Sequence, residues 1–405
     1  MKIIAITAAL VAAAAPACAD PLAIKPLAEA RLRHEHVTQD GLPLDADAVT
    51  TRIRSGVEAR TGGWSALVEA QGTLALVDHY NDGLNGPANR ATVSDPENVA
   101  IYRAQLGYRA TGIALTAGRQ RITLDDEKFV GAAGFRDNGQ TFDAVRAELT
   151  PLRGLKLDVS YAWAARTIWG VDGRGARPTA IGGDNVFVNV GYATPLGTLT
   201  GFAYLVDQDM AAVQNFRLSS QTYGGRLAGT QALPGKARLA YQFSYARQSD
   251  RHRNPNDYAA GYYLADAGLD WHGARLGAGY EVMGADKGAG GGMPLGSFQA
   301  PFGSVFKFQG WADKFTATPP DGVRDRYVSA GYGRPTLGPA TKVSVQAVYH
   351  RFDSDRRSIR YGDEIDLLAQ ATFGRTTAAV RYATYRADGF ATDTDKLWLQ
   401  LDWVL

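Results

Sequence analysis

Apolar and polar residues alternate with a period of two along most of this chain. In residues 155–163 the odd positions hold Leu, Leu, Val, Tyr and Trp, while the even positions hold Lys, Asp, Ser and Ala. The same alternation recurs in residues 238–245 and 275–282. Because successive side chains of a β-strand point to opposite faces, this pattern predicts strands with one apolar and one polar face. No segment reads as a convincing amphipathic helix or a linker, so we predict an all-β chain.

The connections between the predicted strands alternate between short and long ones. Tight turns rich in Gly and Pro are predicted at residues 61–63, 111–112, 151–154, 194–197, 232–235, 272–273, 335–338 and 374–376. Longer polar connections are predicted at residues 38–48, 78–97, 122–139, 166–183, 207–218, 249–256, 284–323, 353–358 and 387–394. Short periplasmic turns and long outer loops are typical of outer-membrane barrels. The sequence therefore predicts a transmembrane up-and-down antiparallel β-barrel of about 18 strands, with both termini in the periplasm.

The beginning of the chain has the features of a secretory signal peptide. Lys2 is followed by an apolar stretch, and Ala17-Cys18-Ala19 offers small residues for cleavage before Asp20. The stretch is much shorter than the roughly 20 apolar residues that a membrane-spanning helix needs. We therefore expect residues 1–19 to be removed and residues 20–405 to form a single barrel domain. Cys18 is the only cysteine, so the mature chain can form no disulfide.

In lipid, the apolar strand faces point outward and the polar faces line the lumen. In residues 99–109 the outer face is predicted to hold Ala100, Tyr102, Ala104, Leu106 and Tyr108. The last strand, residues 395–405, is expected to present Lys396, Trp398, Gln400 and Asp402 to the lumen. A barrel of this width encloses more space than its strand side chains can fill. Loops must therefore plug the lumen, or it conducts.

Arginine is common at the predicted lumen positions. The residues that we predict to line the pore are Arg31, Arg33, Arg52, Arg54, Arg60, Arg103, Arg109, Arg119, Arg136, Arg146, Arg226, Arg238, Arg275 and Arg381. Rings of such cations favour anions in a narrow pore. The alternative is that these arginines pair with carboxylates and stiffen the wall without selectivity. Candidate carboxylates are Glu58, Glu148, Asp158, Glu281, Glu364, Asp366 and Asp402.

Two of the long connections stand out as functional inserts. The connection at 284–323 holds six large aromatic residues, more than a solvated loop normally exposes. It either folds into the lumen as a constriction or packs against the rim, and the constriction hypothesis names Lys307, Phe308, Trp311, Asp313 and Lys314. The connection at 122–139 holds Asp125, Asp126 and Glu127, which are weak candidates for a Ca²⁺ site because their spacing matches no calcium loop. A solvated loop paired with lumen arginines is the simpler interpretation.

The sequence resembles the alginate-export outer-membrane porins. The resemblance rests on four segments: 118–122 (Gly-Arg-Gln-Arg-Ile), 139–146 (Gly-Gln-Thr-Phe-Asp-Ala-Val-Arg), 307–315 (Lys-Phe-Gln-Gly-Trp-Ala-Asp-Lys-Phe) and 362–367 (Gly-Asp-Glu-Ile-Asp-Leu). The likeness extends over nearly all of the mature chain. It implies a monomeric barrel of about 18 strands. It also implies an arginine-rich pore through which alginate, an acidic polysaccharide, leaves the periplasm.

These observations predict a channel rather than an enzyme. The motifs Gly-x-Ser-x-Gly, Gly-x-x-x-x-Gly-Lys-Ser/Thr and His-Glu-x-x-His are absent from the sequence, and its six histidines are scattered. We expect no cofactor, and no nucleic acid as partner because the basic residues are spread over many strands. The expected location is the outer membrane of a Gram-negative bacterium, with outer-membrane lipid, lipopolysaccharide and the barrel-assembly machinery as partners. The predicted cargo is alginate or another acidic saccharide. The alternatives are a general or small-anion porin and a structural barrel closed by its aromatic loop.

Overall fold

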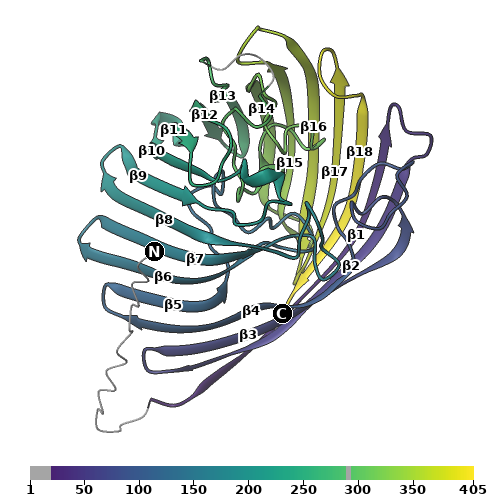
Figure 1. Cartoon of the computed structure of the whole chain (residues 1–405). Coiled ribbons are helices and arrows are strands. Elements are labelled where there is room, and N and C mark those ends of the chain that lie inside the picture. Colours follow the sequence, from purple (N-terminus) through teal and green to yellow (C-terminus); the bar gives the residue numbers. More distant parts are fainter. Residues whose placement is uncertain (1–19, 289–292) are drawn as a thin grey trace.

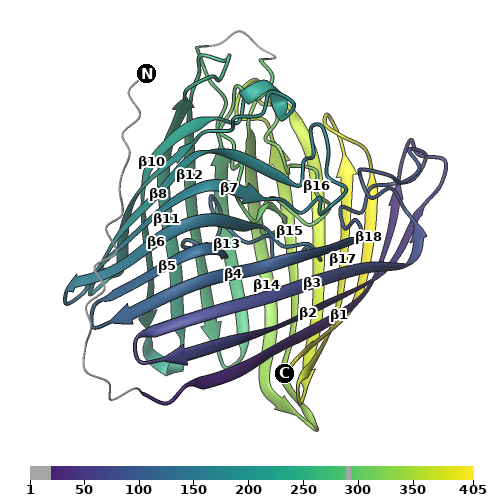
Figure 2. The ribbon, with the colours of Figure 1, turned by 60° about the horizontal axis from the view of Figure 1, so that its bottom comes forward.

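The computed structural model describes residues 20–288 and 293–405, and the predicted signal peptide lies outside these residues. Its strands form one closed antiparallel barrel (Figures 1 and 2). They are β1 Ala23–Gln39, β2 Ala46–Thr61, β3 Trp64–His79, β4 Asn98–Ala110, β5 Ile113–Gln120, β6 Thr141–Leu152, β7 Leu155–Arg166, β8 Ala180–Thr194, β9 Gly197–Val206, β10 Ser220–Ala232, β11 Arg238–Asp250, β12 Ala259–Trp271, β13 Ala274–Met283, β14 Val323–Leu337, β15 Ala340–Asp353, β16 Arg360–Phe373, β17 Thr376–Ala387 and β18 Thr394–Val404. Three short 3-10 helices lie between strands: η1 Gln214–Phe216, η2 Pro234–Lys236 and η3 Val305–Lys307. The predicted fold class is confirmed.

Each strand pairs with its neighbours in the sequence, and β1 closes the ring against β18. Closure is continuous along the seam, from Glu29 opposite Val404 to Gln39 opposite Thr394. A closed ring satisfies the backbone hydrogen bonds of every strand and leaves no free edge. Among the described residues, no helix is long and apolar enough to cross a membrane.

The tight turns and the long connections fall at opposite ends of the strands, as predicted. Leu405 at the chain end donates a hydrogen bond to Ala28, and Val404 donates one to Arg375 in the β16–β17 turn. The C-terminus therefore lies at the tight-turn end. In outer-membrane barrels this end faces the periplasm.

The two faces of the wall differ as predicted, with one correction in β4. Large apolar side chains such as Leu106, Val328 and Leu399 are exposed on the outside. A bulge in the β3–β4 pairing, where Glu69 pairs with Arg103 but Ala70 pairs with Ile101, breaks the alternation predicted for residues 99–109. Tyr102 is consequently only 5% exposed and lies against Arg54, whereas Ile101 is 45% exposed. The prediction that Ala100 and Tyr102 face outward was wrong, because the bulge shifts the alternation and Ala100 pairs with the buried Gln71.

Loop segments occupy the inside of the ring (Figure 1). We call residues 121–140 the first insert and residues 284–322 the second insert. The two pair with each other through a bridge between Val130 and Phe302 and a 2.9 Å hydrogen bond from Gly131 N to Phe302 O. Their aromatic side chains form the main buried apolar cluster together with wall residues such as Phe142 and Phe187. The apolar core of this barrel therefore lies within its lumen, around the inserts.

Candidate functional site: a constriction between two charged walls

Arginines of β1 and β2 form one side of the lumen. Arg31 lies directly opposite Arg52 in the strand pairing, and Arg33 is two residues further along β1 on the same face. Like charges placed opposite each other across strands destabilise a sheet unless anions compensate them. Glu29 accepts hydrogen bonds from Arg52 at 3.1 Å and from Arg54 at 2.7 Å. This side therefore needs further negative charge from elsewhere in the fold.

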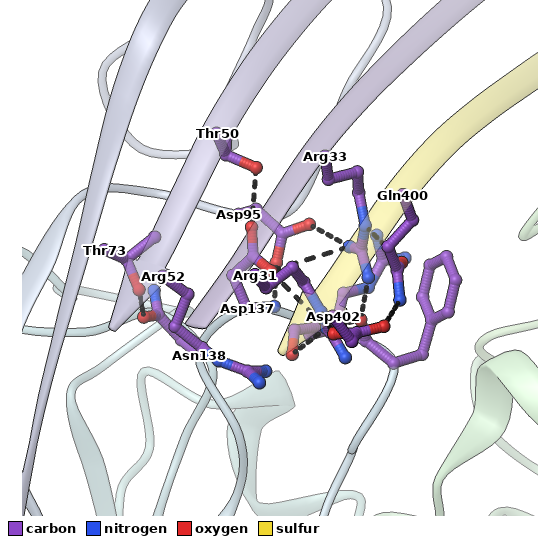
Figure 3. A network of polar contacts seen from close by, with 12 residues as sticks. Arg31, Arg33, Thr50, Arg52, Thr73, Asp95, Asp137, Asn138, Gln400 and Asp402 are labelled. Atoms are coloured by element: carbon purple, nitrogen blue, oxygen red, sulfur yellow. Dashed lines mark hydrogen bonds and ion pairs between the residues drawn. The ribbon is translucent and has the colours of Figure 1, made fainter. Parts of the chain in front are cut away.

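That charge comes from two loops (Figure 3). Asp95 of the β3–β4 loop lies 3.2 Å from Arg33, and Asp137 of the first insert lies 3.5 Å from Arg31. Thr50 donates a 2.6 Å hydrogen bond to Asp137, and the Asp137 backbone N–H donates one of 2.6 Å to Asp95. All of these side chains are buried. The first insert is thus fastened to the arginine wall by a buried ionic network.

The two loop carboxylates have opposite pKa shifts. Burial, followed by the nearby Asp137 charge, raises the pKa of Asp95 to about 6. Burial acts in the same direction on Asp137, but Arg33 and Arg31 outweigh it and hold the pKa of Asp137 below its usual value. Asp137 is therefore the carboxylate that the arginine wall stabilises in its ionised form.

The second insert is fastened to the nearby strands β16 and β18 and to the first insert. Glu364 of β16 accepts hydrogen bonds from the backbone N–H groups of Trp311 and Ala312. Asp313 lies 2.6 Å from Arg136 of the first insert and 2.8 Å from Lys396 of β18. Burial alone would raise the pKa of Asp313, but Arg136 and then Lys396 lower it to about 2. Asp313 therefore stays ionised and joins both inserts to the wall.

An aromatic stack lies where the two inserts meet. The rings of Phe135 and Phe306 are parallel, with centroids 3.3 Å apart, and Trp311 stacks on Phe306 at 6.2 Å. The fully buried Trp398 of β18 meets both Phe rings edge-on. The guanidinium of Arg33 lies 4.3 Å from the Phe135 ring centre. Cation–π contacts of this kind hold the stack against the basic wall.

A cavity of about 720 Å³ adjoins this stack inside the barrel. Arg31 and Arg381 lie on one side of it together with Asp402. The side formed by β12 to β16 is mainly acidic, with Asp266, Asp325 and Asp366, and also holds Arg275. Among the described residues, Arg381 forms no hydrogen bond or ion pair, although its Nη1 is buried. The Phe135 ring centre lies 5.6 Å from the guanidinium carbon, and the charges of Arg33, Arg31 and Asp402 also act on this group. A solute in this cavity would meet a cation without a directly bonded carboxylate, beside an aromatic surface.

Most of the other predicted pore arginines are paired with carboxylates. The pairs are Arg60–Glu58, Arg103–Glu69, Arg119–Asp143, Arg146–Asp158, Arg136–Asp313 and Arg226 with Asp125 and Asp126. Arg109, Arg238 and Arg275 lie near the tight-turn end and are exposed. The wall-stiffening alternative thus describes several of these arginines, whereas Arg31, Arg275 and Arg381 adjoin the cavity. Arg275 also lies 3.7 Å from Asp270.

The five residues predicted to form the constriction do not all line the cavity. Lys307, Phe308 and Trp311 line the cavity, and Lys307 pairs with Glu127. Asp313, whose side chain is 14% exposed, lies in the ionic contact described above. Lys314 donates a 2.6 Å hydrogen bond to Thr394, and burial, followed by Lys396, lowers its pKa to about 8. In the part of the chain that the structure describes, no group of three or more His, Cys, Asp or Glu residues could hold a metal ion.

Sequence reasoning missed the partners that fasten the first insert. Asp95 and Asp137 are separated from Arg33 by 62 and about 100 residues along the chain, and no local pattern connects them. The Asp pair is buried only because both loops fold back into the lumen. The sequence gives one indication of these partners. The first two strands have more arginines than carboxylates, so further carboxylates are expected from elsewhere in the fold.

The fold is similar to that of solved outer-membrane proteins of Pseudomonas aeruginosa. The structure of OpdO has a TM-score of 0.66 at 17% identity, with 94% of this chain and 97% of that chain covered. The structure of the outer membrane protein OpdK has a TM-score of 0.69 at 12% sequence identity. The structure of OpdK with vanillate has a TM-score of 0.68 at 13% identity. Each match covers 94% of this chain and 98% of the other chain.

At these identities the likeness concerns the fold alone, and this chain has the outer-membrane porin fold. No protein-family model and no curated protein sequence matches it. The structural neighbours described are not alginate exporters, so the family resemblance noted in the sequence is supported only at the level of an outer-membrane porin.

Proposed function

We propose that the barrel lies in the outer membrane and passes small anionic solutes through the cavity between its two charged walls. The observation on which this rests is Arg381, a largely buried guanidinium without a carboxylate partner that faces the cavity beside Phe135. A buried cation without a counter-ion is costly unless an anion can reach it. A passing carboxylate supplies that anion, since guanidinium groups bind carboxylates with paired hydrogen bonds.

The aromatic stack favours anions that also have a flat ring. Trp311 and Phe306 border the same cavity as Arg381, so one solute can meet both the cation and the ring faces. OpdK, which shares this fold, has been solved with vanillate, an aromatic carboxylate. We infer that this chain accepts solutes of the same chemical class.

An acidic saccharide of the alginate type is the second candidate cargo. It is favoured by the segment 307–315, in which Phe308 and Trp311 line the cavity and could stack on sugar rings. A long polymer is less favoured, because both inserts are fastened inside the lumen and narrow the path. Liposome swelling with vanillate and with uronate chains of increasing length distinguishes the two cargoes, and entry of long chains would favour the saccharide. No swelling with any solute would indicate the closed structural barrel.

Arg381→Gln is expected to reduce the anion preference of the channel. In planar bilayers under a KCl gradient, the wild type should show an anion-selective reversal potential, and the variant a potential closer to zero. Block of the current by vanillate should weaken by about tenfold, since a hydrogen bond to a charged group contributes about 1.5–3 kcal/mol.

Arg334→Gln is the matched control for this experiment. Arg334 lies on the outer face of β14 near its tight turn, so its substitution removes the same charge outside the lumen. It should leave the reversal potential and the vanillate block unchanged. Cation selectivity of the wild type, or equal effects of the two substitutions, would contradict the proposed anion path.

A further inference from the structure

A group of arginines lies on the outer face of the wall, at the loop ends of β14 to β17. In β14 the exposed Val328 and Tyr332 share this face with Arg324 and Arg326. In β15 and β17 the corresponding residues beyond the apolar band are Arg351 and Arg386. These arginines follow the apolar band directly, at the end of the barrel with long connections. In a membrane this is the boundary between the outer leaflet and water.

Two of these arginines form an unusual pair. Arg326 and Arg351 are directly opposite each other in the β14–β15 pairing, and their side chains are 49% and 48% exposed. Both turn toward one carboxylate, that of Asp353, at 2.5 Å from Arg326 and 3.6 Å from Arg351. Asp353 is only 13% exposed and follows Arg351 by two residues, toward the loop end of the strand. One carboxylate thus contacts two guanidiniums, and among the described residues their remaining N–H groups form no hydrogen bond to another protein group.

Aromatic residues border the arginine pair. The ring of Tyr280 lies 5.7 Å from the Arg326 guanidinium. Tyr349, two residues before Arg351 and on the same face, donates a 2.8 Å hydrogen bond to Asp363. Aromatic girdles of this kind mark the height of the lipid headgroups on outer-membrane barrels. The pair therefore lies level with the headgroups rather than in the hydrocarbon or in bulk water.

Charge and geometry together define the missing group. Two like charges placed directly opposite each other on a sheet are destabilising, and Asp353 is the carboxylate that contacts both. Asp363 lies opposite Arg351 on the other side, but it is held by Arg360 and by Tyr349. Guanidinium forks bind phosphate with paired hydrogen bonds. A phosphate that approaches from the lipid side would complete the site that Asp353 begins from the loop end. A phosphate on a lipid is already held at that height, so it binds without the loss of translational freedom of a free ion.

We propose that Arg326 and Arg351 bind a phosphate group of a phosphorylated glycolipid in the outer leaflet. The proposal rests on the proposed function only for the placement of the barrel in the outer membrane. It assigns a fixed lipid to the β14–β15 side of the wall. The lipid phosphate replaces the charge that the protein itself does not supply there.

The test measures binding of a bis-phosphorylated lipid A to the purified barrel in detergent. The Arg326→Gln/Arg351→Gln variant is expected to bind at least about tenfold more weakly than the wild type, because charge-assisted hydrogen bonds to phosphate are lost. The same lipid A without its phosphates should bind the wild type as weakly as it binds the variant. Excess inorganic phosphate should compete poorly, which distinguishes a lipid site from a site for the free ion.

Arg247→Gln/Arg334→Gln is the matched control. It also removes two exposed outer-face arginines, but neither of them faces another arginine across the sheet. This control should bind the lipid as the wild type does. Equal loss in both variants, or wild-type affinity in Arg326→Gln/Arg351→Gln, would overturn the proposal. Conductance of the variants in bilayers is read separately, so a failure of the proposed channel function remains distinguishable from a failure of the lipid site.

Discussion

Excision of residues 286–320 is expected to raise the single-channel conductance severalfold. This segment is most of the second insert, and it packs against the first insert and contacts Glu364 inside the ring. If it forms the constriction that we predict, its removal widens the path. The cut ends can be joined without moving the wall. A Cβ placed on Gly322 would lie 2.7 Å from the oxygen of Met283, so the two ends of the insert are adjacent. A short Gly-Ser link from Ala285 to Asp321 therefore leaves β13 and β14 paired.

The excision also removes one side of the aromatic stack. Without Phe306 and Trp311, vanillate should no longer block the current, although Arg381 remains in the wall. Recordings in planar bilayers test both effects, and heat-dependent migration in gel electrophoresis verifies that the barrel is folded. Replacement of residues 211–216 in the β9–β10 loop by a Gly-Ser link is the control, because that segment is mostly exposed. Unchanged conductance after the excision would mean that the second insert is not the constriction.

The sequence alone was sufficient to predict the wall because the wall is built from local patterns. Each strand alternates with a period of two, and each reversal at the tight-turn end has its own Gly or Pro, as at Gly62 and Gly154, which both have positive φ. The lumen position of Trp398 followed from the same alternation. The bulge at Tyr102 could not be predicted, since an extra residue in one strand has no distinct signature in the alternation.

The lumen could be predicted only in part, because its contacts join distant segments. The arginines of β1 and β2 were identified as lumen residues from the strand pattern. Their partners Asp95 and Asp137 depend on how two loops fold back, which no periodicity encodes. Arg381 was identified with the other arginines, but its lack of a partner distinguishes it only once the pairs of the others are known. Sequence thus predicted which residues face the lumen, and the tertiary contacts separate paired from unpaired ones.

Asp137→Asn is expected to lower the free energy of unfolding by about 3–5 kcal/mol, the usual cost of removing one partner from a buried ion pair. Asp137 is fully buried between Arg31 and Arg33, and Thr50 donates to it. The amide cannot compensate either guanidinium, so buried positive charge remains in excess. Urea titration of the barrel in lipid vesicles, followed by tryptophan fluorescence, measures the change. The first insert should also detach more often, which appears as larger current fluctuations at constant barrel fold.

Glu58→Gln is the matched control, since Glu58 pairs with the exposed Arg60 at the tight-turn end. An exposed ion pair contributes about 0–1 kcal/mol, so this variant should unfold nearly as the wild type does. Arg33→Gln combined with Asp137→Asn should cost less than the sum of the single substitutions, because the second change removes part of the uncompensated charge that the first one leaves. A loss below about 1 kcal/mol for Asp137→Asn would mean that water reaches this network and that the ionic contacts do not hold the first insert in place.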